Sequence, residues 1–306
     1  MNNNQKITMK SRECTPEILY DLYWNKNITL REIKNIFGIK DRKVLDRWFR
    51  ESNIDKKEDG GTYTFDRYYF DIIDSEEKAY WIGFIWCDGY VLKRQRKNKN
   101  ISYEFKLTLA ERDRGHLIKL NECLKSNYKI KRYKSGGFDG KYPDYHECRL
   151  YICNKYFAGN LFNNYGLIPH RYKINKLISK IPPQYYKHFI RGILDADGSV
   201  ISYYTNDKYC NKPSYKNSVK FDTYSELLTF IQEHFYNKSL IFNKTHFRKR
   251  HKDRDGHCEN LGYSGTIQTP RILNYLYKDA TVYLDRKYNK YLEIINHNKE
   301  EVNEVD

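Results

Sequence analysis

Two short segments of the sequence contain the same dipeptide near their ends, an aspartate followed directly by a glycine. The first segment, AYWIGFIWCDGYV, carries Asp88 and Gly89, and the second, HFIRGILDADGSV, carries Asp197 and Gly198. Aspartate carboxylates, backbone carbonyls and water suit Mg²⁺, and paired metal ions beside a phosphate activate water and stabilise the leaving oxygen of phosphodiester hydrolysis. The pattern predicts two or more divalent ions held by Asp88 and Asp197, with Gly89 and Gly198 as further ligands.

Both segments have the spacing of helices that pack closely against each other. Gly83 and Cys87 are four residues apart in the first segment, as are Gly192 and Ala196 in the second, so each helix presents small residues one turn apart. If the helices touch along these faces, the two aspartates emerge side by side at the negative ends of the helix dipoles. Carboxylates about 4 Å apart repel by roughly 4 kcal/mol at an effective dielectric of 20. A bound cation would compensate; the alternative is an ordinary helix end followed by a turn.

The stretches after the two segments also match and predict an internal repeat. Residues 102–109 alternate between apolar and polar side chains, as do Val219, Phe221 and Thr223, which is typical of half-buried strands. Each strand is followed by an amphipathic helix, further strand material and a closing helix. The predicted fold class is α+β, with two pseudo-symmetric αββαββα repeats at about 74–173 and 174–298.

The residues before the repeats predict a small all-α domain. Thr15 and Pro16 open a short amphipathic helix, and Thr29 caps a second one that Gly38 breaks before a third. The pattern resembles the helix-turn-helix unit, whose second helix enters the major groove of DNA; the alternative is a generic three-helix packing module. The polar side chains expected to contact DNA are Lys40, Arg42, Lys43 and Arg47.

The expected domain boundaries follow changes in composition. A polar tail covers residues 1–10, the helix-turn-helix domain 11–54, a linker with a glycine pair 55–65, the two repeats 66–298, and an acidic tail 299–306.

Charge and composition narrow the function classes. The 306 residues include 55 Lys or Arg and 39 Asp or Glu, a net charge of +16 that favours a polyanionic partner, although drift toward AT-rich codons would also enrich Lys. The longest apolar stretch, 80–87, is too short for a membrane span, and no secretory signal opens the sequence. Seven cysteines without a C-x-x-C pair favour reduced thiols. We expect an intracellular protein, in the cytoplasm or nucleoid of a bacterial or phage-infected cell or in an organelle matrix.

The two acidic segments resemble the motif of a known family. ILDADG at 193–198, preceded by glycine, and the looser WIGFIWCDG at 81–89 are similar to the motif of the LAGLIDADG homing endonucleases. The resemblance covers about residues 65–295 and is typical of single-chain, two-repeat members. It implies that Asp88 and Asp197 are metal-binding catalytic carboxylates, that two four-stranded sheets form a saddle over DNA, and that the enzyme makes a staggered double-strand cut at a long, tolerant site.

The sequence departs from the family pattern at several positions. Trp86 stands where the second motif has Asp195, a position that faces away from the scissile phosphate in the family, so Asp195 is interpreted as structural. The family often carries a basic residue on the last strand of each repeat. Lys155 fits as a catalytic helper in the first repeat, but the second has Ile267 or Gln268 there, which raises nicking as an alternative.

Basic loops and polar strand positions complete the predicted DNA surface. Clustered basic side chains contact phosphates and make binding fall steeply with salt, whereas strand side chains read base edges; a solvated loop is the alternative for any charge run. The candidates in basic loops are Lys93, Arg94, Arg96, Lys97, Lys99, Arg248, Lys249, Arg250 and Lys252, and those on strands include Glu104, Lys106, Thr108, Lys220 and Asp222.

These expectations define a leading function and two others. The leading one is a site-specific, Mg²⁺-dependent DNA endonuclease that acts as a monomer on double-stranded DNA. The alternative is a non-cleaving DNA- or RNA-binding protein of the same fold, such as an intron maturase with intron RNA as partner, or a transcription regulator. A histidine-metal nuclease is disfavoured by the spacing of His246, His251 and His257. The target site, and whether the gene is intron-encoded or free-standing, do not follow from the sequence.

Overall fold

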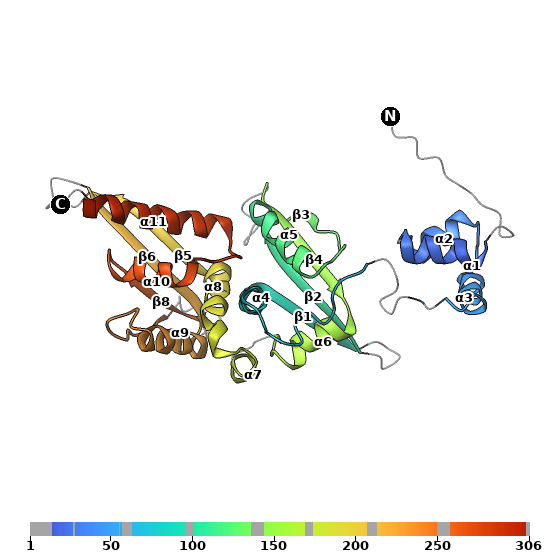
Figure 1. Ribbon diagram of the computed structural model, residues 1–306, viewed down its shortest axis with the longest axis horizontal. Coiled ribbons are helices and arrows are strands. Elements are labelled where there is room, and N and C mark those ends of the chain that lie inside the picture. The colour runs from blue at the N-terminus through green and yellow to red at the C-terminus, as the bar shows by residue number, and fades with distance from the viewer. Residues whose placement is uncertain are drawn as a thin grey trace, which may run out of the picture. The chain divides into compact units, whose positions relative to one another are not determined.

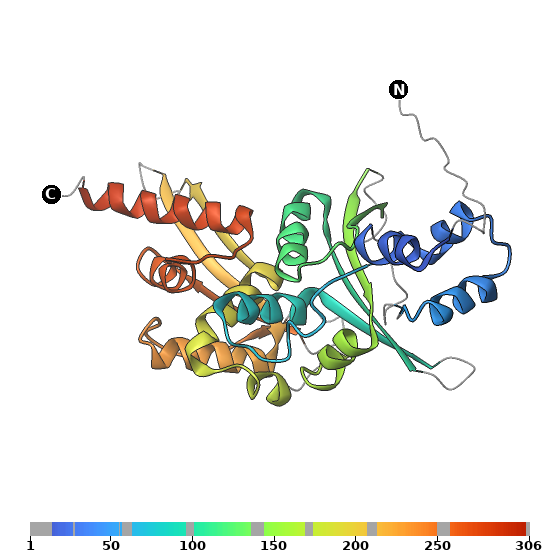
Figure 2. The same cartoon turned by 45° about the vertical axis from the view of Figure 1, so that its right-hand side comes forward.

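The protein forms two compact units. The computed structural model describes residues 14–26, 28–54, 56, 63–95, 101–135, 144–168, 174–206, 213–249 and 258–303 (Figures 1 and 2). The first unit comprises residues 1–66 with 123–128, and the second comprises 67–122 with 129–306. None of the helices in the described ranges has both the length and the apolar character that crossing a membrane requires.

The first unit contains the predicted three helical segments. Thr15 Oγ1 accepts from the first helix at 3.4 Å, and Thr29 forms a capping box with Glu32, in which each side chain accepts from the other residue's backbone N–H at 3.0 Å. Gly38, with φ +64°, makes the turn before the last helix. The helices are α1 (Pro16–Tyr20), continued by the π-helical turn η2 (Asp21–Asn25), then α2 (Leu30–Ile36) and α3 (Arg42–Glu51).

The second unit confirms the predicted repeat. Each repeat contains a four-stranded antiparallel sheet, in the orders β1-β2-β4-β3 and β5-β6-β8-β7. The first repeat comprises α4 (Glu76–Asp88), β1 (Gly89–Gln95), β2 (Ile101–Ala110), the 3-10 turn η3 (Glu111–Asp113), α5 (Arg114–Cys123), β3 (Lys131–Lys134), β4 (His146–Cys153) and α6 (Lys155–Asn163). The second comprises α8 (Tyr186–Asp197), β5 (Gly198–Thr205), β6 (Ser214–Tyr224), α9 (Ser225–Asn237), β7 (Arg248–Lys249), β8 (Cys258–Ser264) and α10 (Gln268–Tyr277).

Three further elements lie outside this repeated pattern. The short helix α7 (Asn175–Ile178) and the 3-10 turn η4 (Pro183–Tyr185) connect the repeats. The last helix, α11 (Asp285–Asn303), runs past residue 298, where the acidic tail was expected to begin.

Each sheet has one face covered by helices and one open face. In Figure 1 the helices of each repeat gather on one side of its sheet, and strand burial alternates accordingly, because successive side chains point to opposite faces. Covered positions include Phe105, Leu107, Leu150, Val219 and Phe221. We call the residues of opposite parity the open face; they include Tyr90, Arg94, Glu104, Lys106, Thr108, Arg149 and Tyr151 in the first sheet, and Ser199, Ser218, Lys220, Asp222, Asn260 and Gly262 in the second.

The two repeats join through α4 and α8, whose backbones approach each other at two glycines. A Cβ added at Gly83 would lie 2.3 Å from the carbonyl oxygen of Phe189, and one added at Gly192 would lie 2.1 Å from that of Tyr80. These contacts are related by the pseudo-twofold, since each glycine meets the residue three positions before the other. Helices this close leave no room for a side chain.

We predict that Gly192→Ala destabilises the protein by about 3 kcal/mol or more, because the new methyl group must displace backbone rather than a flexible side chain. Gly262→Ala is the control: the atoms nearest to its Cβ would be Lys220 Cγ at 3.4 Å and Asn260 Oδ1 at 3.5 Å, both on side chains, so it should leave stability within about 0.5 kcal/mol. Urea titration measures both free energies of unfolding. Equal losses in the two variants would contradict the proposed role of the close helix contact.

Candidate catalytic centre and nucleic-acid interface

Each motif aspartate is the last residue of its helix, and the following glycine is the first residue of a strand. The backbone N–H of Gly89 still donates to Ile85 O, and that of Gly198 to Leu194 O, so helix passes into strand without a loop. A Cβ at Gly89 would lie 2.4 Å from the Ile85 oxygen. The D-G pair therefore does not introduce a turn: the glycine lets the sheet begin directly at the acidic end of the helix.

A buried lysine lies at the end of α8. Lys287, on α11, is 3% exposed, and its Nζ donates to three backbone carbonyls: Leu194 O at 2.6 Å, Asp195 O at 2.7 Å and Gly198 O at 2.6 Å. Asp195 O is among the last carbonyls of α8, which lack N–H partners within the helix and carry the negative end of its dipole, whereas Leu194 O also accepts from Gly198. The ammonium thus supplies both hydrogen bonds and positive charge where α8 ends.

The same ammonium responds to both motif carboxylates. Burial lowers the pKa of Lys287 to about 8; Asp195, Asp88 and Asp197 raise this pKa, and Arg286 lowers it. Asp88 is half-buried and Asp197 is exposed. The two carboxylates therefore lie within electrostatic range of one fixed cation, and a bound metal ion is not the only compensation for their charges.

Sequence reasoning missed Lys287, although a signal was present. Leu284, Lys287, Tyr291 and Ile294 recur at three- and four-residue spacing, and all four are buried. A lysine on the apolar stripe of a helix is rarely buried unless it is paired. In the second repeat Ile267 and Gln268 are not basic, and α11 places Lys287 at the end of α8.

Asp195 connects the two repeats with the segment before α11. Its carboxylate accepts from Tyr80 Oη at 2.8 Å, Tyr277 Oη at 2.5 Å and the backbone N–H of Leu284 at 2.8 Å. Tyr80 Oη lies 2.9 Å from His116 Nε2. Because the phenol proton is donated to Asp195, the Nε2–H of His116 donates to Tyr80 Oη. Burial raises the pKa of Asp195, although neighbouring groups lower it. These contacts are structural and agree with the expected role of Asp195.

An ion pair between Arg191 and Glu76 also joins the repeats near the start of α4. Arg191, fully buried, donates to Glu76 Oε1 at 2.7 Å, to Val282 O at 3.0 Å and to Leu276 O at 2.9 Å. Glu76 Oε1 also accepts from the backbone N–H of Thr281 at 3.0 Å. Glu76, in the first repeat, thus helps to hold the segment that leads into α11 and Lys287.

The oxygen-rich donor set suits a hard cation. Across the described ranges, no group of three or more His, Cys, Asp or Glu side chains could hold a metal ion. The donors at the two helix ends are carboxylates and backbone carbonyls, which fit Mg²⁺ better than Zn²⁺ or copper. At the second helix end, the Gly198 carbonyl also accepts from Lys287 at 2.6 Å.

Two lysines occupy matching positions on the open faces beside the motifs. Lys106 pairs in register with Tyr90, and Lys220 pairs with Ser199; each partner follows the motif glycine by one residue. The pseudo-symmetry therefore gives each half of the site one half-buried lysine, one strand across from the end of the acidic helix.

Other predicted basic residues lie farther away or on the covered side. Lys155 starts α6, two residues after Cys153. Cys153 pairs with Glu104, whereas Gly89, at the end of α4, pairs with Leu107 three residues farther along the same strand. Lys155 therefore lies beyond a point roughly 10 Å along the sheet from the end of α4. Lys93 lies on the helix-covered side, with its Nζ 5.7 Å from the centre of the Phe162 ring. Lys249 also has covered-side parity.

The remaining predicted contacts divide by placement. Arg94 lies on the open face and pairs with Glu104 at 3.3 Å, and Arg248 lies on the open face of β7. Arg96, Lys97, Lys99, Arg250 and Lys252 fall outside the described residues. In the first unit, the predicted DNA contacts Lys40, Arg42, Lys43 and Arg47 all have exposed side chains.

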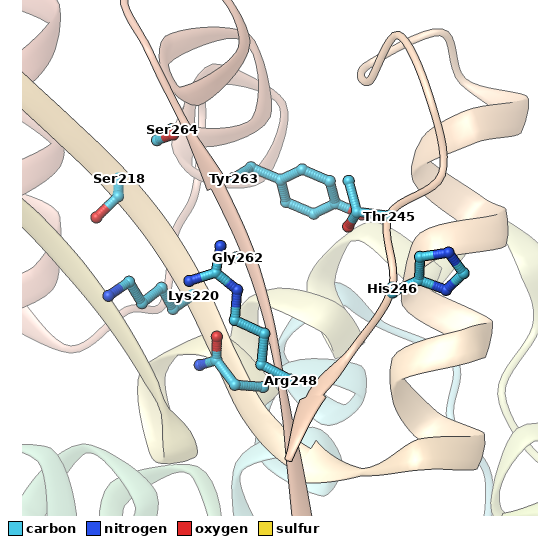
Figure 3. Close-up of a pocket in the computed structure, with 9 residues that line it drawn as sticks. Ser218, Lys220, Thr245, His246, Arg248, Gly262, Tyr263 and Ser264 are labelled. Atoms are coloured by element: carbon cyan, nitrogen blue, oxygen red, sulfur yellow. The ribbon is translucent and has the colours of Figure 1, made fainter. Parts of the chain in front are cut away.

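A hollow of about 200 Å³ opens on the second sheet's open face. Its lining includes Lys220, Arg248, Asn260 and Gly262, and Figure 3 labels Lys220, Arg248 and Gly262 among the residues around it. Gly262 has room for a Cβ and no positive φ, so the backbone does not require glycine here. A glycine inside a strand without a backbone reason marks a place for close approach.

These features define the class of the molecule: an α+β protein of two pseudo-symmetric αββαββα repeats, packed through paired helices that end in aspartate. Solved structures with the same architecture include I-SmaMI, a LAGLIDADG homing endonuclease, bound to cleaved DNA, with a TM-score of 0.52 over 76% of this chain and 91% of that chain at 13% identity. The meganuclease I-SmaMI bound to uncleavable DNA with a TTGT central four gives 0.51 over 74% and 90% at 14% identity. This chain has the LAGLIDADG homing endonuclease fold. Neither protein-family models nor curated proteins match the sequence.

We predict that Asp195→Asn and Asp197→Asn differ sharply in stability although they are two residues apart. The amide introduced at position 195 would point its NH₂ group at groups that themselves donate, and it would remove the carboxylate that most raises the pKa of Lys287. We expect the free energy of unfolding to fall by about 3 kcal/mol. At 197 an exposed charge is removed from a helix C-terminus, so stability should be unchanged or a few tenths of a kcal/mol higher. Denaturant titration of both variants checks this, and similar losses would contradict the structural role of Asp195.

Proposed function

We propose that this protein is a site-specific DNA endonuclease that makes a staggered double-strand cut by divalent-metal-dependent phosphodiester hydrolysis. The observation that carries the proposal is the pair of motif aspartates at the ends of two closely packed, pseudo-symmetric helices, within range of one buried ammonium. A twofold-related pair of acids matches the two strands of a duplex, which are also related by local twofold axes.

The groups at the helix ends divide the chemistry. Asp88 and Asp197, with backbone carbonyls beside them, would hold Mg²⁺, which when bound supplies an activated water and charge compensation for the leaving oxygen. Lys287 fixes the end of α8 and adds positive charge next to the scissile phosphates. We assign it the role of basic helper in the second half in preference to Lys155.

The open faces would hold the DNA. Lys106 and Lys220 lie close to the strand starts and would contact the phosphates nearest the cut, and the polar side chains farther along each sheet would read base edges. The first unit adds a helix-turn-helix grip through Arg42, Lys43 and Arg47 on α3, with the neighbouring Lys40. Intracellular action as a monomer completes the proposal; RNA binding as a maturase is the competing function.

Each of the two motif aspartates should be required for double-strand cleavage. Asp88→Asn and Asp197→Asn should lower the rate of double-strand cleavage by at least about a thousandfold, since several kcal/mol of transition-state stabilisation depend on the metal, while DNA affinity persists. The assay incubates protein with DNA from a close relative of the source that lacks this gene, in Mg²⁺ or in EDTA, and sequences the new ends.

The control for that assay is Asp74→Asn, which removes an exposed carboxylate that pairs with Lys78 and should cleave as the unaltered protein does. Discrete Mg²⁺-dependent ends that vanish in both motif variants support the endonuclease. If the unaltered protein binds particular fragments in a salt-sensitive way but produces no ends, the non-cleaving regulator or maturase function replaces it.

The two candidate lysines should behave differently. Lys287→Met should slow cleavage about a hundredfold, or about 2.7 kcal/mol, because a fixed positive charge is lost beside both carboxylates; Lys155→Met should stay within about threefold, because its position is far along the sheet. Lys287→Arg, which keeps the charge, should recover part of the rate. Unfolding is followed in parallel so that only folded protein is compared. A larger loss in Lys155→Met would return the helper role to Lys155.

A further inference from the structure

Among the open-face cations in the described residues, Arg149 is held in place without being neutralised. Its Nε donates to Thr108 Oγ1 at 3.2 Å, and its guanidinium carbon lies 4.2 Å from the centre of the Tyr133 ring. In the part of the chain that the structure describes, no ion pair joins it to a carboxylate. Arg94, by contrast, is paired with Glu104 at 3.3 Å.

Three strands build this arrangement. Arg149 on β4 stands between Thr108 on β2 and Lys131 on β3 in register, and Tyr133 lies one same-face step along β3. The side chain is half-buried, with Cys148 and Leu150 on either side of it pointing into the core. The stacked ring and the hydroxyl fix the plane of the guanidinium before any ligand arrives, so little side-chain entropy is lost on binding.

The chemistry left over suits a guanine. With Nε engaged, the N–H groups on both Nη atoms remain to donate in one plane, and guanine presents two acceptors, O6 and N7, in the major groove. The strand that carries Arg149 is an interior strand of the sheet, where base edges rather than the flanking phosphates would meet it when the sheet lies along the groove.

The second repeat does not reproduce the arrangement around Arg149. The position related to Arg149 by the pseudo-symmetry is Asn260, because Thr108 corresponds to Asp222 in the register of the two sheets. Asn260 Nδ2 donates to Asp222 Oδ1 at 2.8 Å, which commits an amide donor within the protein. The two halves therefore present different hydrogen-bonding groups at equivalent places.

We propose that Arg149 is a specificity-determining residue that reads a guanine in one half of the DNA target, with no matching guanine required at the symmetric position of the other half. The proposal rests on the proposed function only in that the open face binds DNA; it does not need cleavage.

The test is selection of bound sites from a randomised double-stranded DNA pool in EDTA, with the unaltered protein, Arg149→Gln and Arg132→Gln. Arg132 is the matched control, since it lies on the neighbouring edge strand, is exposed and has the opposite parity to Tyr133. We expect a guanine preference of about 10- to 100-fold at one position for the unaltered protein and Arg132→Gln, and its loss at that position alone in Arg149→Gln.

Thr108→Val tests whether the hydrogen bond that orients Arg149, rather than the packing around it, supports the guanine preference. It keeps the shape but removes the acceptor for Nε, so the guanine preference should weaken several-fold at the same position while the rest of the profile stays the same. A guanine preference that survives Arg149→Gln overturns the proposal, as does a uniform loss of affinity without a change in profile, which would identify a phosphate contact. If the unaltered protein selects no sequence at all, site-specific DNA recognition itself fails; if it selects one that Arg149→Gln does not alter, only this proposal fails.

Discussion

The architecture depends on one constraint: the backbones of α4 and α8 must touch. Gly83 and Gly192 allow it, with each missing side chain replaced by a carbonyl of the other helix. Because the contact is made just above the helix ends, it fixes where both motif aspartates emerge and where both sheets begin. A larger residue at either glycine would separate the repeats and spread the carboxylates, so packing and chemistry cannot vary independently here.

Crowding two carboxylates at two helix C-termini is electrostatically unfavourable, and the chain offsets it asymmetrically. The segment after α10 is tied down by Asp195, Arg191 and Glu76, and it delivers Lys287 to the end of α8. A buried cation so anchored persists in the absence of any ligand. The acidic pair is thus preorganised by the protein, which is how charged sites avoid reorganisation during a reaction.

Much of this could be predicted from sequence, because it rests on local periodicity. The repeated D-G motif, the alternation along 102–109 and the capping of Thr29 each correspond to a contact or a burial pattern close in the chain. The features that the sequence did not reveal have a different origin. Lys287 binds backbone carbonyls of another helix, which no side-chain pattern encodes, and the faces of Lys93 and Lys249 depend on strand parity that a run of basic letters does not reveal.

Pseudo-symmetry within one chain also permits the two repeats to diverge, and equivalent positions on their open faces differ in some places and not in others. Lys106 and Lys220 remain equivalent beside the acidic ends, where both halves would face the same chemical group, a phosphate. On the neighbouring strand, Arg149 in the first sheet corresponds to Asn260 in the second, and Tyr151 corresponds to Gly262 and its hollow. The two open faces therefore share a lysine beside each motif but present different hydrogen-bonding groups on the next strand. Under the proposed function, such a surface would fit a duplex whose two half-sites differ in sequence, because different groups would meet the bases in each half.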